Sequence, residues 1–465
     1  MGERKSAKTR YSLYDGNTNK TLKRRAARGN ANQRADRRTC GERDKYREVW
    51  MKVSRRTAIK GALAAGVSSQ VLKVPAAVAQ AGPIQIGFLT VKTGPLASGG
   101  IQMEQGLTVF FKERNYTLGG RKVEVHTADT GGNPAQTRTK TQELVERLKV
   151  SALIGPLAAF EALAIDDYIR STQTPILTVA GAEDMTQRKA NPWLVRPSST
   201  SAQPSHPVGD YAAKELKLKR VACIADDFAF GHENVAGFQR AFEDAGGKVV
   251  QKLWPPLNAP DYATYISQLK PNIDGVYTGH AGSNGFKFIK QLREYGNTAQ
   301  ILGGFTPVDE SLLQQMGDDA LGAITGNWYS AVLDNPINKR FVAAIQKDYK
   351  VDPGVYAAET YLCGEVLEEA LKQVNGNIED KNAFMKALKG VNLKESLRGP
   401  MHFDEYGNVV GNNYIRKVER RGGKLVNAVV KTYPDVSQFW TYKPEEFLKQ
   451  PVYSRDFPPA KNLEN

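Results

Sequence analysis

Two neighbouring carboxylates and five histidines are the side chains of this sequence with the types needed for acid–base chemistry. Asp226 and Asp227 are adjacent, and a carboxylate pair can serve as general acid and general base. An enzyme would most readily combine Asp227 with His280, because histidine titrates near neutral pH unaided. Asp residues directly after a strand are also common helix caps, and we expect Asp226 and Asp227 to cap the helix that follows.

Other catalytic and metal-binding patterns are absent from the sequence. No nucleophile elbow, zinc-protease motif, P-loop or dinucleotide-binding loop occurs, and the stretch 279–285 has the wrong spacing for either glycine motif. No two histidines have metal-ligand spacing, and Cys40, Cys223 and Cys363 form no C-x-x-C pair. We therefore expect no metal, no cofactor and no enzymatic activity, and we favour binding without chemistry.

A backbone feature near residue 155 is suited to an anion without any side-chain chemistry. The pattern predicts a buried strand over 152–154 that ends at Gly155-Pro156 and turns directly into a helix. The first N–H groups of a helix lack intrahelical acceptors, and the helix dipole adds partial positive charge there. A carboxylate ligand fits this position, although such turns are also common in α/β proteins without a ligand.

The net charge of +15 is concentrated at the start of the chain. Residues 1–50 hold 15 Lys and Arg against 6 Asp and Glu, and residues 51–81 hold 5 basic residues and no acidic one. Residues 82–465 hold 44 basic against 43 acidic residues, so the body of the protein is almost neutral. A phosphate-binding surface is not implied, and we expect no nucleic-acid partner.

Residues 51–81 have the composition of an export signal. A basic start that includes Arg55 and Arg56 is followed by an apolar run and by two A-x-A cleavage patterns. The basic start is similar to a twin-arginine signal. Because this signal has its own start at Met51, we interpret residues 1–50 as a disordered basic extension upstream of the true start. The mature protein is expected in the periplasm.

The elements that must position these features alternate regularly from Pro83 onward. Apolar residues recur with strand spacing and then with helix spacing, and glycines or prolines separate the segments. The predicted strands of this first region lie near 84–88, 123–125, 152–154 and 175–179. The β-α-β order predicts a parallel sheet with helices on both faces.

After a Pro- and Ser-rich boundary at 196–201 the same pattern starts again. A second set of strands is predicted at 221–225, 249–253, 273–277 and 301–303. The segment 336–389 is purely helical and must cover an existing sheet, whereas 399–432 predicts β-hairpins and the tail is expected to wrap a surface. Ligands of parallel sheets lie beyond the carboxyl ends of the strands, so two facing lobes would form one cleft with a hinge.

Four local motifs occur in the chain in this order: Thr93-Gly94-Pro95, Ile154-Gly155-Pro156, Phe230-Gly231 after the Asp pair, and the run from Gly399 to Gly407. In their order and spacing the chain resembles the periplasmic solute-binding proteins of ABC importers, specifically the branched-chain amino acid (Leu/Ile/Val-binding) type. The resemblance covers about residues 83–432. It implies an α/β fold of type I, a two-lobed clamp in which each lobe is a mostly parallel sheet flanked by helices.

The resemblance also implies where the lobes begin and end. Three hinge crossings would lie near 196–200, 325–330 and 398–403. The first lobe would be 83–197 plus 330–399, and the second would be 198–329 plus 400–465 with a wrapping tail. The implied partners are a small-molecule ligand and an ABC permease in the inner membrane, and the implied state is a monomer.

Residues that hold an α-amino acid in such proteins are replaced here. Ala159-Phe160 and Gly181-Ala182 stand in the two turns where members carry Ser and Ala-Thr for the α-carboxylate. Phe305 stands where an acidic residue pairs with the α-ammonium, and a buried ammonium without a partner costs on the order of several kcal/mol. An aromatic contact of the first lobe is replaced by Gly99, and a tyrosine contact of the second lobe by Phe230.

The resemblance and its departures together favour a flat aromatic acid, such as a benzoate or phenylpropanoid, as the ligand. Rings from phenylalanines would stack on the guest, backbone N–H groups near 159 and 181 would hold its carboxylate, and His280 would be a donor. The candidate ligand-binding residues are Gly99, Ala159, Phe160, Gly181, Ala182, Phe230, His280 and Phe305.

Three alternatives remain open at the level of sequence. An amino acid or amide ligand would require Glu183 or Asp227 to bind the ammonium group. An enzyme would use Asp227 and His280. A sensing subunit would present the closed clamp to a membrane receptor instead of a permease. The phenylalanines could also be ordinary core residues, since Phe is among the most commonly buried residue types.

Overall fold

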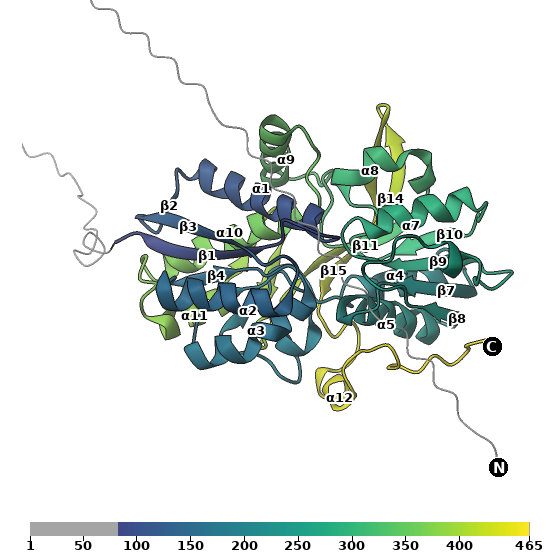
Figure 1. The fold of residues 1–465 in the computed structure, drawn as a ribbon, viewed down its shortest axis with the longest axis horizontal. Coiled ribbons are helices and arrows are strands. Elements are labelled where there is room, and N and C mark those ends of the chain that lie inside the picture. Colours follow the sequence, from purple (N-terminus) through teal and green to yellow (C-terminus); the bar gives the residue numbers. More distant parts are fainter. Residues whose placement is uncertain (1–81, 465) are drawn as a thin grey trace, which may run out of the picture. The chain divides into compact units, whose positions relative to one another are not determined.

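The computed structural model describes residues 82–464, which contain two β-sheets with their helices (Figure 1). The predicted extension and export signal lie outside the described residues. No helix within 82–464 combines the length and apolar character needed to cross a membrane.

The first sheet has six strands in the order β2-β3-β1-β4-β5-β6, and all neighbours are parallel except the edge pair β2 and β3. Its strands are β1 (Ile84–Thr90), β2 (Thr117–Leu118), β3 (Arg121–Asp129), β4 (Ala152–Ile154), β5 (Ile176–Leu177) and β6 (Leu194–Val195). The four strands predicted in this region are present. The sequence did not reveal β2 and β6, because two residues are too few for an alternation to be visible.

Six helices cover the first sheet. They are α1 (Ala97–Glu113), α2 (Pro134–Gln142), α3 (Ala159–Thr172), α9 (Pro336–Tyr349), α10 (Val355–Gln373) and α11 (Lys381–Lys389), and one π turn (Glu143–Arg147) extends α2. The helix α1 packs against α10 and α9, whereas α2 packs against α3. Apolar residues of α9 to α11 share one buried core with β1 and β4, which confirms that the helical segment 336–389 returns to cover this sheet.

The second sheet has nine strands, in which β8, β7, β9, β10 and β11 are parallel and the remaining strands are antiparallel. They are β7 (Arg220–Ala225), β8 (Lys248–Leu253), β9 (Gly275–Gly279), β10 (Gln300–Gly303), β11 (Ile324–Asn327), β12 (Asn392–Leu393), β13 (Met401–Phe403), β14 (Val409–Arg421) and β15 (Lys424–Val436). The predicted hairpins of 399–432 are confirmed, and Gly422 and Gly423 turn the chain between β14 and β15 with positive φ angles of 55° and 82°.

Helices α4 to α8 belong to this second sheet. They are α4 (Ser205–Lys214), α5 (Ala229–Asp244), α6 (Ala263–Ile266), α7 (Asn284–Glu294) and α8 (Glu310–Met316), with a short 3-10 turn at Gly317–Ala320 and a last helix α12 (Pro444–Lys449) in the tail. Another 3-10 turn (Glu183–Thr186) lies between β5 and β6 of the first sheet. Rings of the tail, including Phe447 and Tyr453, share a small apolar cluster with Ala236 of α5. We call the first sheet with its helices the first lobe and the second sheet with its helices the second lobe.

The chain passes between the lobes after β6, after β11 and ahead of β12. Arg196 and Asn408 form an isolated parallel bridge where the two sheets meet. The short strand β12 already pairs with β13, so the chain joins the second sheet before the predicted third crossing. The exact lobe boundaries given above stay a prediction.

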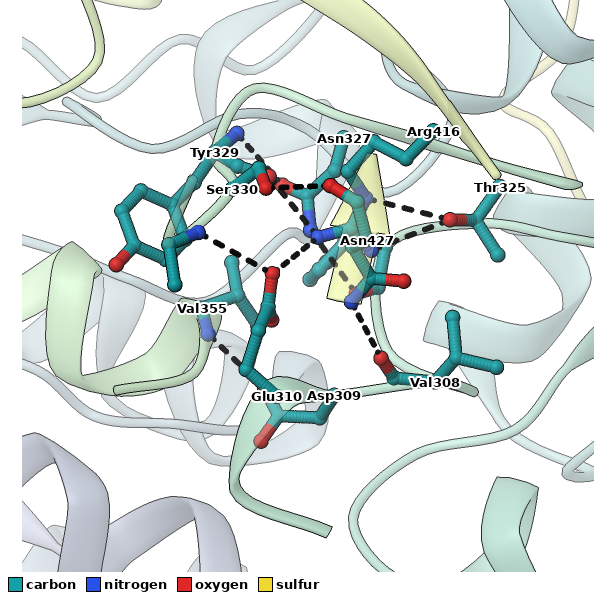
Figure 2. Close-up of polar contacts among 12 residues, drawn as sticks. Val308, Asp309, Glu310, Thr325, Asn327, Tyr329, Ser330, Val355, Arg416 and Asn427 are labelled. Carbon is teal, nitrogen blue, oxygen red and sulfur yellow. Dashed lines mark hydrogen bonds and ion pairs between the residues drawn. The ribbon is translucent and has the colours of Figure 1, made fainter. Parts of the chain in front are cut away.

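The second crossing is fixed to the second lobe by buried polar contacts (Figure 2). Arg416 of β14 is fully buried and donates to the carbonyl oxygen of Tyr329 at 2.9 Å and to Glu310 at 3.0 Å. The hydroxyl of Ser330 donates to the carbonyl oxygen of Asn427 at 2.7 Å. The start of this crossing is therefore anchored to the second sheet.

Candidate ligand-binding cleft

The turn between β4 and α3 offers backbone donors without acceptors. Gly155 has a φ of +97°, and a Cβ there would lie 2.2 Å from the carbonyl oxygen of Leu89, so the turn requires glycine. The N-cap residue Ala158 has no side-chain oxygen for capping, and its own N–H donates to Glu161 at 2.9 Å. Within the described chain, no group accepts from the N–H of Ala159 or of Phe160.

The turn after β5 adds a further backbone donor. Gly181 is buried against Ser201, whose Oγ would lie 2.5 Å from a Cβ at this position. No described group accepts from the Gly181 N–H. Ala182 is also buried, and its carbonyl oxygen accepts from Arg196. Buried backbone N–H groups without an acceptor are rare in proteins, so this edge of the first sheet is prepared for an external acceptor.

Aromatic rings of the second lobe face this edge. Phe228 and Phe230 stand at the start of α5 with ring centroids 5.9 Å apart, and Phe230 meets Phe305 edge to face at 5.4 Å. Phe160 of α3 contacts Phe228 at 5.5 Å, so a ring contact joins the two lobes.

A cavity with about 360 Å³ of atom-free space lies between these elements. Four of the eight candidate residues line it, namely Ala159, Gly181, Phe230 and Phe305. Its other lining residues are Leu96, Leu157, Ala158, Val179, Phe228, Ala281, Tyr356 and Glu359. The cavity is therefore walled by both lobes and is mostly apolar.

The other four candidate residues lie beside the cavity without lining it. Phe160 and Ala182 follow lining residues directly. Gly99 allows two lining residues to pack closely against α1, since a Cβ there would lie 2.9 Å from Leu157 and 3.2 Å from Tyr356. His280 precedes Ala281 but is itself fully buried.

The surroundings of His280 are those of a core residue. Its Nδ1 lies 2.6 Å from the hydroxyl of Thr278, and its ring packs against Tyr262 and Phe288. Burial lowers the pKa of His280 to about 3, so the ring stays neutral at physiological pH. Its Nε2 has no hydrogen-bond partner among the described residues, and it does not reach the cavity lining.

The two aspartates do not act as expected from the sequence. The N-cap of α5 is Phe228 and has no side-chain cap, so the prediction that Asp226 and Asp227 cap this helix was wrong. Asp226 instead accepts from the N–H of Ala281 at 2.7 Å, which holds the loop that lines the cavity. Asp227 lies 2.8 Å from His232 and does not pair with His280.

Sequence reasoning missed the wall that α10 contributes. Tyr356 and Glu359 are one turn apart on this helix, and the Tyr356 hydroxyl accepts from the N–H of Gly282 at 3.3 Å, across the lobes. A signal was available in the sequence: Glu359 interrupts a run of apolar and small residues on a helix that had to be buried. Charged residues at such positions are rarely buried without a purpose.

Comparison with known proteins decides the family. The sequence profile of periplasmic binding proteins matches residues 83–424. The chain belongs to the periplasmic binding protein family. It is an ABC transporter substrate-binding protein of the Leu/Ile/Val-binding type with the type I fold, and it is not an enzyme. The fold class expected from the sequence is confirmed.

Similar proteins come from several bacteria. A Leu/Ile/Val-binding protein homolog of Brucella abortus is 27% identical over 373 residues, which are 78% of this chain and 95% of that protein. A solute-binding protein of Rhodopseudomonas palustris BisB5, solved in complex with 3,4-dihydroxybenzoic acid, is 33% identical with a TM-score of 0.73 and covers 77% of this chain and 98% of its own. Another from R. palustris, in complex with benzoate, is 25% identical with a TM-score of 0.72 and covers 78% and 100%.

Within the described residues, no group of three or more His, Cys, Asp or Glu side chains has the arrangement of a metal site. Cys223 and Cys363 are free and buried, as expected for small apolar residues.

Proposed function

We propose that this periplasmic binding protein captures a single-ring aromatic carboxylate in its cleft and delivers it to an ABC permease. The observation that carries the proposal is the set of N–H groups without acceptors at Ala159, Phe160 and Gly181, of which Ala159 and Gly181 are buried. A carboxylate has two oxygens that accept such bonds, and it also benefits from the dipole of α3. The ligand would complete the hydrogen bonding of this edge of the sheet.

The apolar walls support an aromatic guest. Phe228, Phe230, Phe305 and Tyr356 surround the cavity, and aromatic pairs gain from stacked or edge-to-face contacts. A flat guest such as a benzoate or a phenylpropanoid offers a ring face to these side chains.

Two structural neighbours support the ligand class, since they were solved with 3,4-dihydroxybenzoic acid and with benzoate. We propose Ala159, Phe160 and Gly181 as the carboxylate site and Phe230 and Phe305 as ring contacts. Gly99, Ala182 and His280 would lie behind the lining residues, without touching the ligand.

An amino acid ligand is the second candidate, because one acidic residue does line the cavity. That residue is Glu359 and neither of the two carboxylates considered from the sequence. Glu183 is fully buried behind the cleft, and Asp227 pairs with His232 outside it.

For delivery, we propose that the chain acts in the periplasm as a monomer after export by the twin-arginine-like signal. A sensing role would use the same closed clamp with a different membrane partner. Binding measurements address the ligand, whereas transport assays with a permease address the partner.

A thermal-shift panel tests the proposed function. Benzoate, 4-hydroxybenzoate, leucine and valine are each added to the purified protein. A ligand specific for the folded state raises the free energy of unfolding by about 2.7 kcal/mol at a hundredfold excess over its Kd. We expect shifts with the aromatic acids. Shifts with leucine or valine and none with the aromatic acids would contradict the proposal.

A further inference from the structure

Glu359 is a buried acid that faces the cavity without a partner. The residue is 2% exposed and lines the cavity. No hydrogen bond or ion pair to its carboxyl group is present among residues 82–464. The other polar side chain in the lining, Tyr356, is already engaged with the N–H of Gly282. A buried polar group normally has a hydrogen-bond partner, so the Glu359 carboxyl group has an unmet requirement that a ligand can fill.

The state of this carboxyl group suits a neutral partner. Burial raises the pKa of Glu359 well above the usual value for a glutamate, and the nearby Asp309 carboxylate adds to the shift. A protonated carboxyl group donates one hydrogen bond and accepts others. A hydroxyl group has the same dual capacity, whereas a second carboxylate or an apolar ring edge does not.

Glu359 and the carboxylate site approach the cavity from opposite sides of the first lobe. In the first sheet, β3 lies on one side of β1, and β4 and β5 lie on the other. The connection through α1 therefore crosses the sheet in the opposite direction to the connections through α2 and α3. Because such connections are right-handed, α1 and α3 cover opposite faces of the sheet. Since α10 packs on α1, Glu359 belongs to the α1 side. A ring with its carboxylate at the start of α3 directs its far edge toward α10.

We propose that Glu359 hydrogen-bonds a hydroxyl group on the ring, so that the preferred ligand is a hydroxylated aromatic acid. This inference rests on the proposed function and names the ligand class more closely. A site built to bond a hydroxyl group discriminates against the analogue that lacks it, because the buried partner is then left unpaired.

An ammonium group is the competing partner for Glu359. It would require the ionised carboxylate, and both charges would have to leave water for an apolar cavity. An α-amino acid also carries its ammonium and carboxylate on the same carbon, whereas Glu359 and the start of α3 reach the cavity from opposite faces of a sheet. These arguments favour the hydroxyl group, and the variants below separate the two.

Calorimetric titration of benzoate, 4-hydroxybenzoate, 3-hydroxybenzoate and leucine into the wild type and two variants tests the inference. Glu359→Gln keeps hydrogen-bonding capacity without charge, and Glu359→Leu removes both. We expect the wild type to prefer at least one hydroxybenzoate over benzoate by about 10- to 100-fold. Glu359→Leu should abolish this preference, and Glu359→Gln should keep most of it.

A matched control is Glu365→Gln on the same helix. Glu365 is also buried but accepts from the N–H of Leu397 and does not line the cavity. This variant should keep the wild-type preference, and melting curves should show that all variants fold.

Three results have separate meanings. An unchanged hydroxybenzoate-to-benzoate ratio in folded Glu359→Leu overturns the role of Glu359 but leaves the proposed function standing. Leucine binding that is lost in Glu359→Gln overturns it in favour of an ammonium partner. Absence of any aromatic-acid binding by the folded wild type overturns the proposed function itself.

Discussion

At the scale of single residues, Phe305 gives the second lobe an uncharged, apolar side chain in the cavity lining. The ring is 5% exposed, lines the cavity and meets Phe230 edge to face. The carbonyl oxygen of the same residue accepts from Asn327, which fixes the backbone beneath the ring. Phe305 therefore presents an apolar ring to the cavity, and its backbone is held by a hydrogen bond.

Phe305→Glu should abolish binding of aromatic acids. The new carboxylate would lie in the cavity with the ligand carboxylate, and buried like charges without partners cost on the order of several kcal/mol, so affinity should fall more than about 100-fold. Phe305→Leu is the matched control, since it stays apolar, and it should lose about 3- to 10-fold through weaker ring contact. Calorimetry measures both. Unchanged affinity in a folded Phe305→Glu variant would place Phe305 outside the site.

The sequence predicted part of the cavity lining because some of its positions directly follow strands. Ala159 and Gly181 follow strands directly, so their place at the sheet edge could be inferred from the β-α order. Tyr356 and Glu359 arrive from a helix about 200 residues later in the chain, and no local pattern indicates which turn of that helix meets the cleft. The ring of His280 packs against core rings and not in the cavity lining, which its place directly after a strand did not indicate.

At the scale of elements, a hydrogen bond connects the start of α8 in the second lobe to the start of α10 in the first lobe. Asp309, the N-cap of α8, accepts from the N–H of Val355 at 2.9 Å, as Figure 2 shows, and from the side chain of Gln102 on α1 at 3.0 Å. Gln102 also donates to Ser311 at 2.9 Å. One carboxylate thus accepts hydrogen bonds at the starts of helices in both lobes.

Gln102→Leu should weaken ligand binding by favouring the open form. The change removes two hydrogen bonds between the lobes and leaves the cavity lining intact, and a net loss of about 1 kcal/mol corresponds to roughly a fivefold lower affinity. Small-angle scattering should show a smaller change on adding ligand.

Gln346→Leu is the control for this substitution. Gln346 also donates to an aspartate, Asp352, but both belong to the first lobe. Equal affinities for wild type and Gln102→Leu would show that this contact does not hold the lobes closed.

The β-α order and the returning helices were predictable because their apolar periods are long enough to read. The short strands β6 and β12 and the strand β11 were missed, and these lie at the crossings between lobes. The strands β6 and β12 have two residues each and β11 has four, which is too short for a clear apolar alternation in the sequence.

At the scale of the whole molecule, several carboxyl groups are buried in the folded protein. Burial raises the pKa of Glu183 to about 7, of Asp226 to about 7 and of Glu365 to about 8. These groups hold protons more tightly in the folded state than in the unfolded chain. Their contribution to stability is therefore present at low pH and is lost as the pH rises through the folded-state pKa.

The melting temperature should fall as the pH rises from about 6.5 to 8. This window is chosen because burial lowers the pKa of His206 and His280 to about 3, and these groups act in the opposite direction below about pH 6.5. Glu365→Gln should flatten the slope, whereas Glu445→Gln on the exposed α12 should not. A melting temperature that rises through this window would contradict the sign of these shifts.

A crystal structure of the protein with 4-hydroxybenzoate tests the central claim most directly. The ligand carboxylate should lie within about 2.7–3.2 Å of the N–H groups of Ala159 and Phe160, with the ring against Phe230. The hydroxyl group should point to Glu359. A ligand outside this cavity, or one with its carboxylate at Glu359, would contradict the assignment of the cleft.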